Sequence, residues 1–571
     1  MDNRIIQFGI LCEDLSLHRW HLDAARELLA MNETELLCVL NHPGSVRRNA
    51  TMNRKAGRYL LWHLYRFLIA DRIFPTNRKM NKLDEFSRVP VIPVDPDDPA
   101  QSREELQRTI SGHAADSTLD FLLNLSGTGK GGIDATLTRY GVWKPYYGNV
   151  EEYGENPHCF WELAENRNVT EFGLISASGA NSSYRVIRRG YLKTQKSSYL
   201  LNRRQIYRES ARLLRQCCND IRSGNAGYLK SEPATVNPAE DRPPDNGTLL
   251  KVFGRGLANM ASEVVINTLY VERWNIGIIS EPVASVLSEE KPEPEIRWYP
   301  EPKRSYIADP LMVENGEEAY LFFEELDYYS GKGTIAYDRS ADGLPAAQWK
   351  RVMDHQYHLS YPYVVQYNGG YFCIPETFET NEIAIYEAER FPDLWKKRQV
   401  LVDQFPGVDS TVFQHGDHWW MCTSNKDDGV NYKLYVFYSD DLFGPWNPHP
   451  LNPVKIDSRS SRSAGNPFRV DGELYRPAQD FSGKRQGGIT INRVLELTPE
   501  RYREEMVRPI TPFKKTPYPD KIHTVTGNDR YTVIDSCREE FIGKNPAYAV
   551  YSISSILRFA GQTVKQGVLG K

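Results

Sequence analysis

A repeat of about 50 residues, found five times after Trp274, constrains the fold of this chain more than any other feature. Each copy contains an apolar strand, a turn with glycine and a second strand that is usually rich in aromatic residues. The copies begin at Ala308, Tyr361, Asp409, Asn466 and His523. A fixed period of strands without helices is typical of sheets stacked radially about an axis. The sequence therefore predicts an all-β, five-bladed β-propeller over residues 274–545.

The segments between the repeats supply further strands of the predicted blades. Four of them read TIAYDR, EIAIYEAE, LYVFYSDD and ITINRVLE. The first three lead to a tryptophan (Trp349, Trp395 and Trp446), and the fourth leads to Tyr502. The stretch WNIGIIS at 274–280 precedes the first repeat, and we expect it to close the ring as a strand beside the last repeat.

The chain before the propeller has a different texture, in which apolar strands alternate with helix-like segments. RIIQFGIL is followed by LHRWHLDAARELLA and then by ELLCVLNH, and further strands lie at 120–126 and 169–178. This alternation predicts a Rossmann-like α/β domain over residues 1–230 with an open, mostly parallel sheet. Residues 231–273 begin with the linker-like SEPATVNPAEDRPPDNG and continue into a predicted connecting helix, and 546–571 form a tail.

The net charge and the apolar segments limit the classes of partner. The formal net charge is −4, which argues against nucleic acid. No run of 18 apolar residues predicts a membrane-spanning helix, and the amino terminus reads as a strand and not as a signal peptide. The eight cysteines show neither CxxC spacing nor a disulfide framework, so we expect reduced thiols and a cytoplasmic protein.

Polar residues recur at the strand starts that would crowd around the propeller axis. These starts carry Asp309, Ser360, Tyr361, Asp409, Arg462, Ser463 and His523. The second strands add Glu324, Glu325, Glu376 and Arg476, with Asp480 just beyond. A buried charge is costly unless it is paired or used. Two interpretations stay open: an active site, or charges that cap turns and stitch neighbouring blades together.

The propeller region resembles family-43 glycoside hydrolases, and most closely the amino-terminal domain of glucosamine inositolphosphorylceramide transferases. The resemblance covers roughly residues 270–540 and is carried by the motifs YIADPLMV, FFEE, WNIGI and HTVTGNDRYTVIDS. In the hydrolases one Asp is the general base, a second Asp tunes the acid, and a Glu is the general acid. The resemblance implies that Asp309 is the base, whereas Ser360 stands in place of the tuning Asp and Asp409 in place of the acid.

These departures favour transfer of a sugar over hydrolysis. Glycosidic chemistry needs one ionised and one protonated carboxyl group at a controlled distance. Asp309 and Asp409 could form this pair, with Glu325 or Glu376 as stand-ins. For a phosphate-bearing donor, the phosphate could be neutralised by Arg462, Arg476 and Lys332, because the arginine fork matches phosphate oxygens. The other predicted substrate-binding residues are His358, Tyr361, Asp480 and His523.

The segment 139–189 resembles formyltransferases of the methionyl-tRNA and sugar-amine type, a likeness that extends over about residues 1–225. It rests on GVW, on the region of Gly148 and Gly154, and on the FWEL helix start. That family uses an Asn-x-His pair and a later Asp for proton transfer. Here Lys144-Pro145-Tyr146 stands in the place of the pair, and no carboxylate stands near 181–183. We therefore expect a formyltransferase-like domain without formyltransferase activity.

Three segments of this domain each have two interpretations. SGTGKGG at 126–132 is either a mobile loop or a phosphate-binding loop, although it lacks the GxxxxGK[ST] spacing. The arginine-rich helix 202–215 presents either a solvated face or a contact with an anionic lipid or donor phosphate. The apolar segment 58–74 is either a core or partner helix, or one that lies on a membrane surface beside a lipid-linked acceptor.

Together these features predict an enzyme that transfers a glycosyl group during synthesis of a surface glycan or glycolipid, through a site in the propeller channel. The alternatives are formyl or acyl transfer to an amino sugar, glycoside hydrolysis, and a glycan-binding scaffold without catalysis. The expected partners are a nucleotide-sugar donor and a lipid-linked acceptor, in the cytoplasm or at the periphery of the membrane. The sequence has no loop with the spacing of calcium ligands; a divalent cation and a homo-oligomer stay open.

Overall fold

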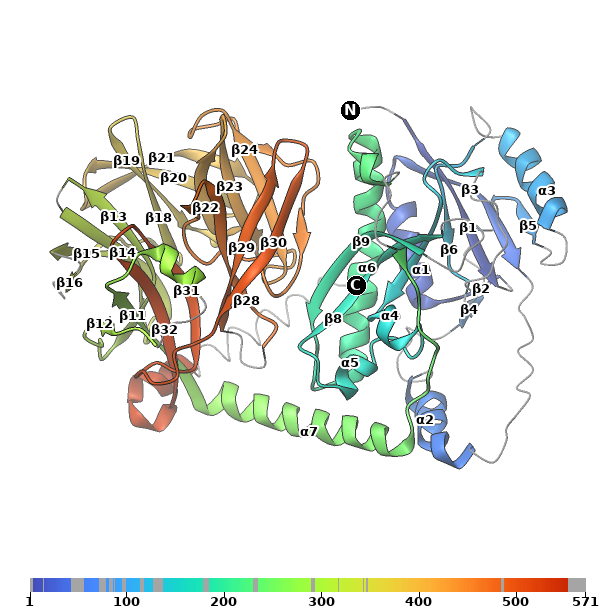
Figure 1. The fold of residues 1–571 in the computed structure, drawn as a ribbon, viewed down its shortest axis with the longest axis horizontal. Coiled ribbons are helices and arrows are strands. Elements are labelled where there is room, and N and C mark those ends of the chain that lie inside the picture. The colour runs from blue at the N-terminus through green and yellow to red at the C-terminus, as the bar shows by residue number, and fades with distance from the viewer. Residues whose placement is uncertain are drawn as a thin grey trace. The chain divides into compact units, whose positions relative to one another are not determined.

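The computed structural model describes residues 4–552, except for 14, 43–55, 71–78, 82–85, 87, 95–98, 113–117, 127–136, 178–183, 230–234, 289–292, 317, 342–343, 346–347 and 484–486. The chain divides into two compact units, Met1–Met260 (unit 1) and Ala261–Lys571 (unit 2). The boundary falls within helix α7 (Asn246–Leu269), drawn in green in Figure 1. The predicted loop at 127–132 and the segment 181–183 lie outside the described residues.

Unit 1 is built on one mixed eight-stranded sheet in the order β10-β9-β8-β7-β6-β1-β3-β5 (Figure 1). Its strands are β1 (Ile6–Glu13), β3 (Thr34–His42), β5 (Val91–Pro93), β6 (Phe121–Asn124), β7 (Val142–Tyr147), β8 (Val169–Ala177), β9 (Tyr184–Lys193) and β10 (Thr235–Val236). The five strands from β7 to β5 pair in parallel. The other three pair antiparallel, so the predicted mostly parallel sheet holds for its larger part.

The core of unit 1 follows from the apolar runs seen in the sequence. Phe8, Phe121 and Trp143 stand on three neighbouring strands and stack in series, with ring centroids 5.4 Å and 3.9 Å apart. Helices α1 (Arg19–Leu29) and α6 (Tyr199–Arg222) pack on each other, and α6 also packs on β7 and β8. The buried stripe of each amphipathic helix therefore covers the sheet, as its helical period requires.

The order of the parallel strands indicates where a ligand would bind at one edge of this sheet. From β1 the chain runs outward to β3 and β5, then returns to β6 on the other side of β1. The strand order therefore reverses between β1 and β6, which end at Glu13 and Asn124. In open α/β sheets, ligands bind outside the carboxyl ends of the strands at such a reversal.

The smaller elements of unit 1 lie around this sheet. They are β2 (Ser16–His18), which pairs with β4 (Lys79–Asn81), together with η1 (Ala56–Tyr59), α2 (Leu60–Tyr65), η2 (Arg66–Ala70), α3 (Pro99–Ser111), α4 (Val150–Tyr153), α5 (Trp161–Ala164) and η6 (Ala226–Leu229). The apolar segment predicted at 58–74 is thus helical over its described part. Trp62 and Tyr65 are buried there, whereas Leu60, Leu64 and Phe67 are exposed.

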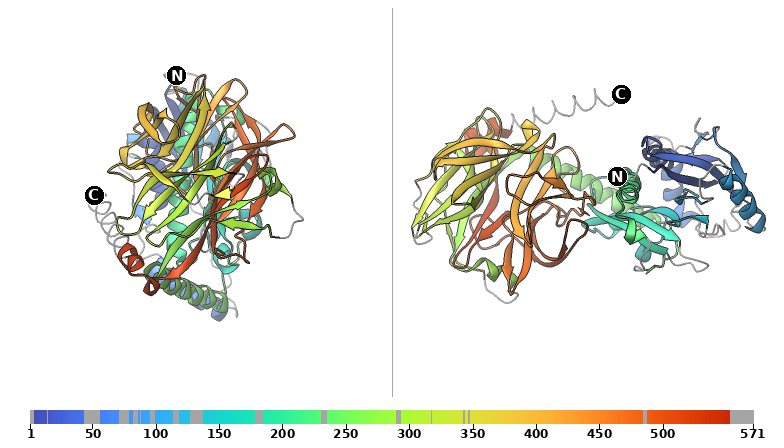
Figure 2. Two further views of the ribbon diagram at one scale, coloured as in Figure 1. Left: turned by 90° about the vertical axis from the view of Figure 1, so that its left-hand side faces the viewer. Right: turned by 90° about the horizontal axis from the view of Figure 1, so that it is seen from above.

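Unit 2 contains five antiparallel sheets, the blades of the predicted propeller (Figures 1 and 2). Blade 1 comprises β13 (Ser305–Asn315), β14 (Glu318–Asp327), β15 (Lys332–Ala341), β16 (Leu344–Pro345) and β17 (Lys350–Met353); blade 2 comprises β18 (Ser360–Tyr367), β19 (Gly370–Glu376), β20 (Glu382–Arg390) and β21 (Leu394–Asp403). Blade 3 comprises β22 (Gly407–His415), β23 (His418–Asn425), β24 (Lys433–Ser439), β25 (Asn447–Pro448) and β26 (Lys455–Ile456); blade 4 comprises β27 (Phe468–Val470), β28 (Glu473–Asp480), β29 (Gly488–Leu497) and β30 (Tyr502–Ile510).

Blade 5 closes the ring from both ends of the propeller sequence. It joins β31 (Lys521–Gly527) and β32 (Thr532–Phe541) to β11 (Tyr270–Ile279) and β12 (Ile296–Trp298). Strand β11 carries the WNIGIIS stretch and pairs with β32 along its whole length, which confirms the predicted closing strand. The first strands of neighbouring blades are also in contact, β31 with β13, β13 with β18 and β18 with β22.

A bulge recurs near the start of the first strand in blades 1, 2 and 3. The register shifts after Ala308, Ser360 and Val408. The residue that follows is Asp309, Tyr361 or Asp409, with φ of 53°, 45° and 50°. These left-handed conformations are uncommon for residues other than glycine and persist only where the surroundings enforce them. Each bulge turns one polar residue out of the strand ladder, so Asp309, Tyr361 and Asp409 share one backbone conformation.

All eight cysteines are buried in the structure, and none of them forms a disulfide. In the part of the chain that the structure describes, no helix is long and apolar enough to cross a bilayer.

Candidate functional site

Carboxylates form hydrogen bonds between neighbouring blades around the propeller axis. Asp535 Oδ2 accepts the backbone N–H of Asp309 at 2.9 Å, and Asp309 Oδ2 accepts that of Tyr361 at 3.2 Å. Glu376 Oε2 accepts the backbone N–H of Asp409 at 3.1 Å. In each case the acceptor comes from one blade and the donor is the bulged residue of the next. Stitching of blades, one of the two interpretations left open by the sequence, is therefore one role of these acids.

His523 lies between two of the acids and provides the positive charge of the cluster. Its Nε2 is 3.0 Å from Asp309 Oδ1 and its Nδ1 is 2.8 Å from Asp535 Oδ2. Burial alone would lower the pKa of His523, but the charges of Asp535 and Asp309 raise it well above its ordinary value. Trp274 packs on the ring with centroids 4.2 Å apart. Asp309 thus faces an imidazole whose pKa favours the protonated form.

The second half of the cluster pairs an arginine with Asp409 and leaves Glu376 beside them. Arg462 Nε donates to Asp409 Oδ2 at 2.6 Å, and Gln479 Nε2 donates to the same oxygen at 2.8 Å. Burial and the negative charge of Asp409 raise the pKa of Glu376 to about 8, against the opposing charge of Arg462. The cluster therefore contains Glu376, a neutral acid at pH 7, beside Asp409, which is paired with a cation.

Glu324 and His358 extend the cluster toward blade 1. The His358 Nδ1 accepts the backbone N–H of Gly333 at 3.0 Å, so the ring proton lies on Nε2, which is 3.4 Å from Glu324 Oε1. Burial and the charges of Asp309 and Glu376 raise the pKa of the Glu324 carboxyl well above its ordinary value. Glu324 is thus a second neutral acid within reach of the charge of Asp309.

A small cavity borders the cluster at Asp309. Its volume is about 10 Å³, roughly the room of one water molecule, and Tyr361, Gly465 and Thr524 also line it. The Tyr361 hydroxyl bonds to Thr411 Oγ1 at 2.8 Å and accepts the Gly465 N–H at 2.9 Å. The side chains of Arg462, His523 and His358 stay 21–23% exposed. A sugar in this conformation would therefore meet these three side chains before the buried acids.

Four of the predicted site residues lie away from the cluster. Glu325 accepts from Ser305 Oγ at 2.9 Å and from Arg351 Nε at 2.7 Å, because it points to the opposite face of β14 from Glu324. Lys332 donates to Asp354 Oδ1 and to the carbonyl of His355. Asp480 accepts the backbone N–H of Ser482 at 2.8 Å and so caps a turn.

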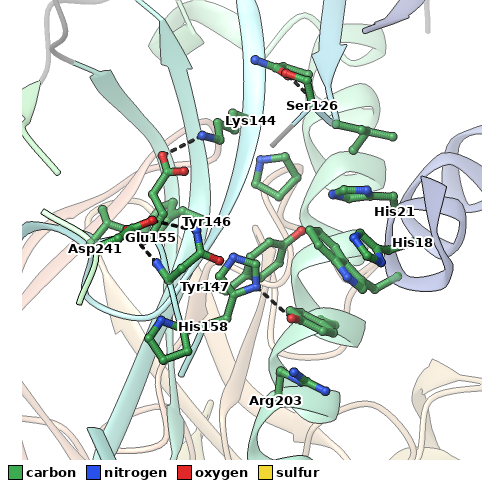
Figure 3. Close-up of a pocket in the computed structure, with 18 of the residues that line it drawn as sticks. His18, His21, Ser126, Lys144, Tyr146, Tyr147, Glu155, His158, Arg203 and Asp241 are labelled. Atoms are coloured by element: carbon green, nitrogen blue, oxygen red, sulfur yellow. Dashed lines mark hydrogen bonds and ion pairs between the residues drawn. The ribbon is translucent and has the colours of Figure 1, made fainter. Parts of the chain in front are cut away.

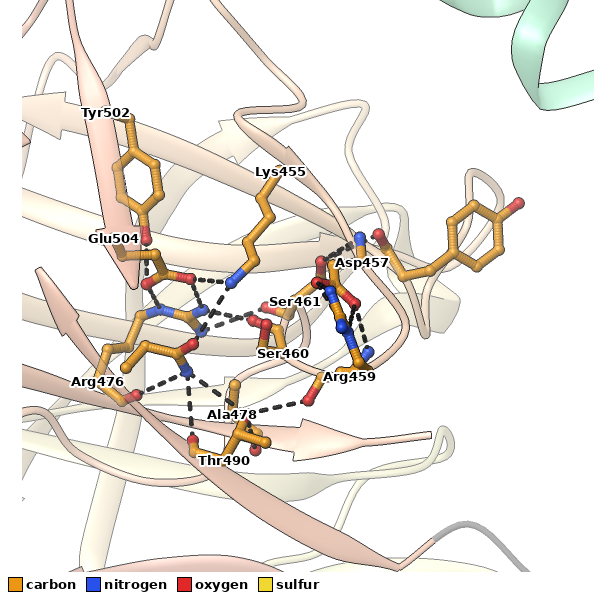
Figure 4. Close-up of polar contacts among 12 residues, drawn as sticks. Lys455, Asp457, Arg459, Ser460, Ser461, Arg476, Ala478, Thr490, Tyr502 and Glu504 are labelled. Carbon is orange, nitrogen blue, oxygen red and sulfur yellow. Dashed lines mark hydrogen bonds and ion pairs between the residues drawn. The ribbon is translucent and has the colours of Figure 1, made fainter. Parts of the chain in front are cut away.

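Arg476, the fourth, belongs to a separate network at the outer side of blade 4 (Figure 4). Only 1% of it is exposed. Its Nε and Nη2 donate to Glu504 at 2.9 and 2.6 Å, and its Nη2 and Nη1 donate to the carbonyls of Ser460 and Ser461. Lys455 adds a third donor to Glu504 at 2.7 Å. A donor phosphate therefore has no access to Arg476. Of the three cations predicted to bind phosphate, Arg462 alone is in the cluster.

Three members of the cluster were missing from the predicted set. Asp535 and Gln479 were not among the polar residues named on the second strands, and Glu324 was named there but, unlike Glu325, was not assigned to the catalytic set. The signal was present in the repeat itself. Glu324 and Glu376 face Ala308 and Ser360, the residues before the bulges, and Asp535 faces Thr524 just after His523. The equivalent position in the last repeat faces Ile522 and is Ser536, so this register points to Glu324 and Glu376 but does not identify Asp535.

Asp309, His523 and Asp535 can also be tested as ligands for a metal ion. Each offers one atom, and the three atoms lie within 4.8 Å of one another. Calcium takes six to eight oxygen ligands, whereas this group supplies two carboxylates and an imidazole. A metal-bound histidine must also be deprotonated, and the two carboxylates favour the proton on His523. The described residues at this position therefore fit an ion-paired imidazolium and not a calcium site.

Comparison with known proteins supports the likeness read from the motifs. Residues 299–518 match the protein family described as "Glucosamine inositolphosphorylceramide transferase 1, N-terminal". The glucosamine inositolphosphorylceramide transferase 1 of Oryza sativa subsp. japonica is 34% identical over 208 residues, which are 35% of this chain and 28% of the rice protein. The protein of the same name from Arabidopsis thaliana is 34% identical over 208 residues, 35% of this chain and 27% of its own length. The predicted resemblance of the propeller to this amino-terminal domain is confirmed.

The match covers less than a third of the length of these curated relatives. Among solved structures, a thermostable family-43 glycoside hydrolase aligns with 39% of this chain and 79% of its own, at 15% identity and a TM-score of 0.30. The residues matched by the family all lie in unit 2. The formyltransferase-like character of unit 1 is not tested by these matches and stays a prediction.

Proposed function

We propose that this chain is a carbohydrate-active enzyme that transfers a glycosyl group during synthesis of a glycolipid, and that the acid cluster of the propeller carries the reaction. One observation supports this above the others: the cluster contains Asp309, which is 3.0 Å from the His523 imidazole, and also Glu376, whose pKa is raised to about 8 so that it keeps its proton at neutral pH. Glycosyl chemistry needs this division between a base or nucleophile and a proton donor.

The role of each residue follows from its partners. Asp309 would stabilise positive charge on the sugar or accept a proton. Glu376 would protonate the leaving group, since burial and Asp409 keep its proton in place. Arg462 is partly exposed and would meet a phosphate on the donor, while Gln479 keeps Asp409 in position. The likeness to transferases of inositolphosphorylceramide supports a sugar donor and a lipid-linked acceptor as the substrates.

The test compares two variants of the cluster with a matched control outside it. Release of nucleoside diphosphate from a panel of nucleotide sugars would be measured with the full chain, together with cleavage of nitrophenyl glycosides. Asp309→Asn and Glu376→Gln should each lower turnover by about 10²–10⁴-fold. Glu325→Gln, one residue from Glu324 but bonded to Ser305 and Arg351, should keep wild-type turnover. Full turnover in Asp309→Asn would contradict the proposal.

A second candidate is a glycan-binding protein without catalysis. It is favoured by the inter-blade hydrogen bonds of Asp309, Glu376 and Asp535. The same panel separates the two: binding of sugars with no turnover of any donor or glycoside in the wild type would favour the second candidate.

The predicted peripheral location, in the cytoplasm at a membrane surface, stays a proposal with its own support. Helix α2 and the following η2 expose the apolar residues Leu60, Leu64, Phe67, Leu68 and Ile69. A partly basic helix with such a face can lie on a bilayer surface, where a lipid-linked acceptor would be found. Co-sedimentation with phosphatidylglycerol vesicles should be lost in Phe67→Asp and retained in Leu201→Asp, which alters an exposed leucine of α6. Equal binding of both variants would contradict this location.

A further inference from the structure

Unit 1 contains a large pocket at the carboxyl edge of its parallel strands (Figure 3). Its volume is about 810 Å³, within the range of sites for small organic ligands. Glu13 at the end of β1, Asn124 at the end of β6 and Lys144 on β7 line it. The pocket therefore opens where the strand order reverses, which is the position at which open α/β sheets bind ligands.

Arg203 is a buried cation in this wall that no carboxylate of the described residues neutralises. It is 6% exposed, and its Nη2 has no hydrogen-bond partner. Its guanidinium lies over the rings of Tyr199 and Tyr207, 5.2 and 5.8 Å from their centroids. Cation–π contacts of this kind recover only part of the cost of burying a charge. The position is therefore suited to an anion that enters from the pocket.

Glu13 also has an unsatisfied polar atom, but this atom is a hydrogen-bond acceptor and not a donor. Its Oε1 is a buried acceptor without a donor among the described residues. Each unsatisfied buried polar group in a native protein calls for an explanation, such as a ligand. Ser126 follows β6, the strand that ends beside Glu13. Figure 3 shows Ser126 and Arg203 at opposite ends of the pocket. A ligand that satisfies both groups needs an anion at one end and a hydroxyl or amine donor at the other.

The middle of the pocket is aromatic and does not compete for the anion. Trp20 stacks on Tyr207 with centroids 4.8 Å apart, and Tyr147 meets it edge-on at 4.9 Å. Of the polar groups along this stretch, Lys144 pairs with Glu155 at 2.6 Å, and Asp241 accepts the backbone N–H groups of Glu155 and Asn156. The remaining surface is suited to a flat, largely apolar body such as a base or sugar ring.

We infer that unit 1 binds a phosphorylated metabolite, a nucleotide or a sugar phosphate, with its phosphate on Arg203 and a hydroxyl or amine donor on Glu13. This site is independent of the acid cluster in unit 2, and its test does not use turnover. Lys144 and Tyr146, which stand in the place of the Asn-x-His pair of formyltransferases, also line this pocket. The substitution replaces neutral catalytic groups with a Lys144–Glu155 ion pair, so the inference concerns binding and assigns no formyl transfer.

The experiment is calorimetric titration of the full chain with uridine diphosphate, glucosamine 6-phosphate and inorganic phosphate. The wild type should bind one of the two organic phosphates more tightly than inorganic phosphate, and the tighter of the two identifies the body of the ligand. Arg203→Met should weaken that binding by at least about tenfold, and Arg203→Lys by less. Arg208→Met, on the same helix but exposed and paired with Glu209, should bind as the wild type does.

Thermal unfolding without ligand separates binding from a structural role. If Arg203 awaits an anion, Arg203→Met should melt at the same temperature as the wild type or higher, because a buried unpaired charge is removed. Failure of both organic phosphates to bind, equal affinity in wild type and Arg203→Met, or a large loss of stability in Arg203→Met would each overturn the inference.

Discussion

The centre of the propeller and the pocket of unit 1 both bury charged side chains, but they satisfy them in opposite ways. Histidine, arginine and backbone groups donate to the carboxylates of Asp309 and Asp409, although Glu324 Oε1 in the same cluster has no hydrogen-bond donor among the described residues. In unit 1, Arg203 and Glu13 each keep an unsatisfied polar atom beside about 810 Å³ of space. Charges of the first kind stabilise the fold and can also react, whereas charges of the second kind are positioned for a ligand. Substitutions should separate the two kinds by their effect on stability.

The largest effect is expected where a propeller charge is fully enclosed. Glu504→Ala leaves Arg476 and Lys455 buried without their carboxylate and should lower the free energy of unfolding of unit 2 by about 3–5 kcal/mol. Urea denaturation followed by amide hydrogen exchange would measure this loss. Glu505→Ala, the next residue, removes an exposed pair with Arg493 and should cost less than about 1 kcal/mol. A similar loss of unfolding free energy in both variants would show that the enclosed charges do not stabilise the fold more than the exposed pair does.

A smaller loss is expected at the propeller centre itself. Asp535→Asn weakens the ion pair with His523 and the acceptor for the Asp309 and Thr524 N–H groups, and should cost about 1–3 kcal/mol. It should also lower the pKa of His523, which the two carboxylates hold above its ordinary value. Histidine NMR titration would follow this change. An unchanged His523 titration in the variant would show that Asp535 does not hold the proton.

The pH dependence of the propeller should report the neutral state of Glu376. Because its pKa is raised from 4.5 to about 8 in the folded protein, its contribution to stability is fully present below pH 4.5 and is lost as the pH rises to about 8. Relative to Glu376→Gln, which mimics the protonated acid, the wild type should lose about 1 kcal/mol per pH unit within this interval. Denaturation at a series of pH values tests this. A constant difference between the two proteins would mean that Glu376 is ionised throughout.

The smallest effect is expected in the pocket of unit 1. Glu13→Gln should change the free energy of unfolding by less than about 0.5 kcal/mol, since Oε1 of Glu13 has no donor among the described residues. Asp220→Asn in the same unit should cost more than about 1 kcal/mol, because Asp220 is the buried partner of Arg188 at 2.5 Å. A cost for Glu13→Gln equal to that of Asp220→Asn would place Glu13 among the structural charges.

The repeat made the propeller predictable, because its period, the strand after each repeat and the closing WNIGIIS stretch are local patterns with one compatible packing. The residues at the bulges were predictable for the same reason: Asp309, Tyr361 and Asp409 occupy one phase of that period. The roles of the side chains on the neighbouring second strands were less predictable. Glu324 and Glu325 read alike in the sequence, yet the alternation of a strand sends Glu324 toward Asp309 and Glu325 toward Arg351.

The sequence by itself determined the two-part organisation, the five blades, the strand starts that carry acids, and the reduced cysteines, since each depends on composition or on a short periodic pattern. Only the tertiary structure decided which charges meet. Asp535 reaches Asp309 across 226 positions of the chain, and Arg476 turns away from the axis to Glu504. The pocket of unit 1 was also invisible in the sequence, because the ends of β1, β6 and β7 come together only when the sheet forms. Pairing of distant charges depends on three-dimensional distance, which no local pattern encodes.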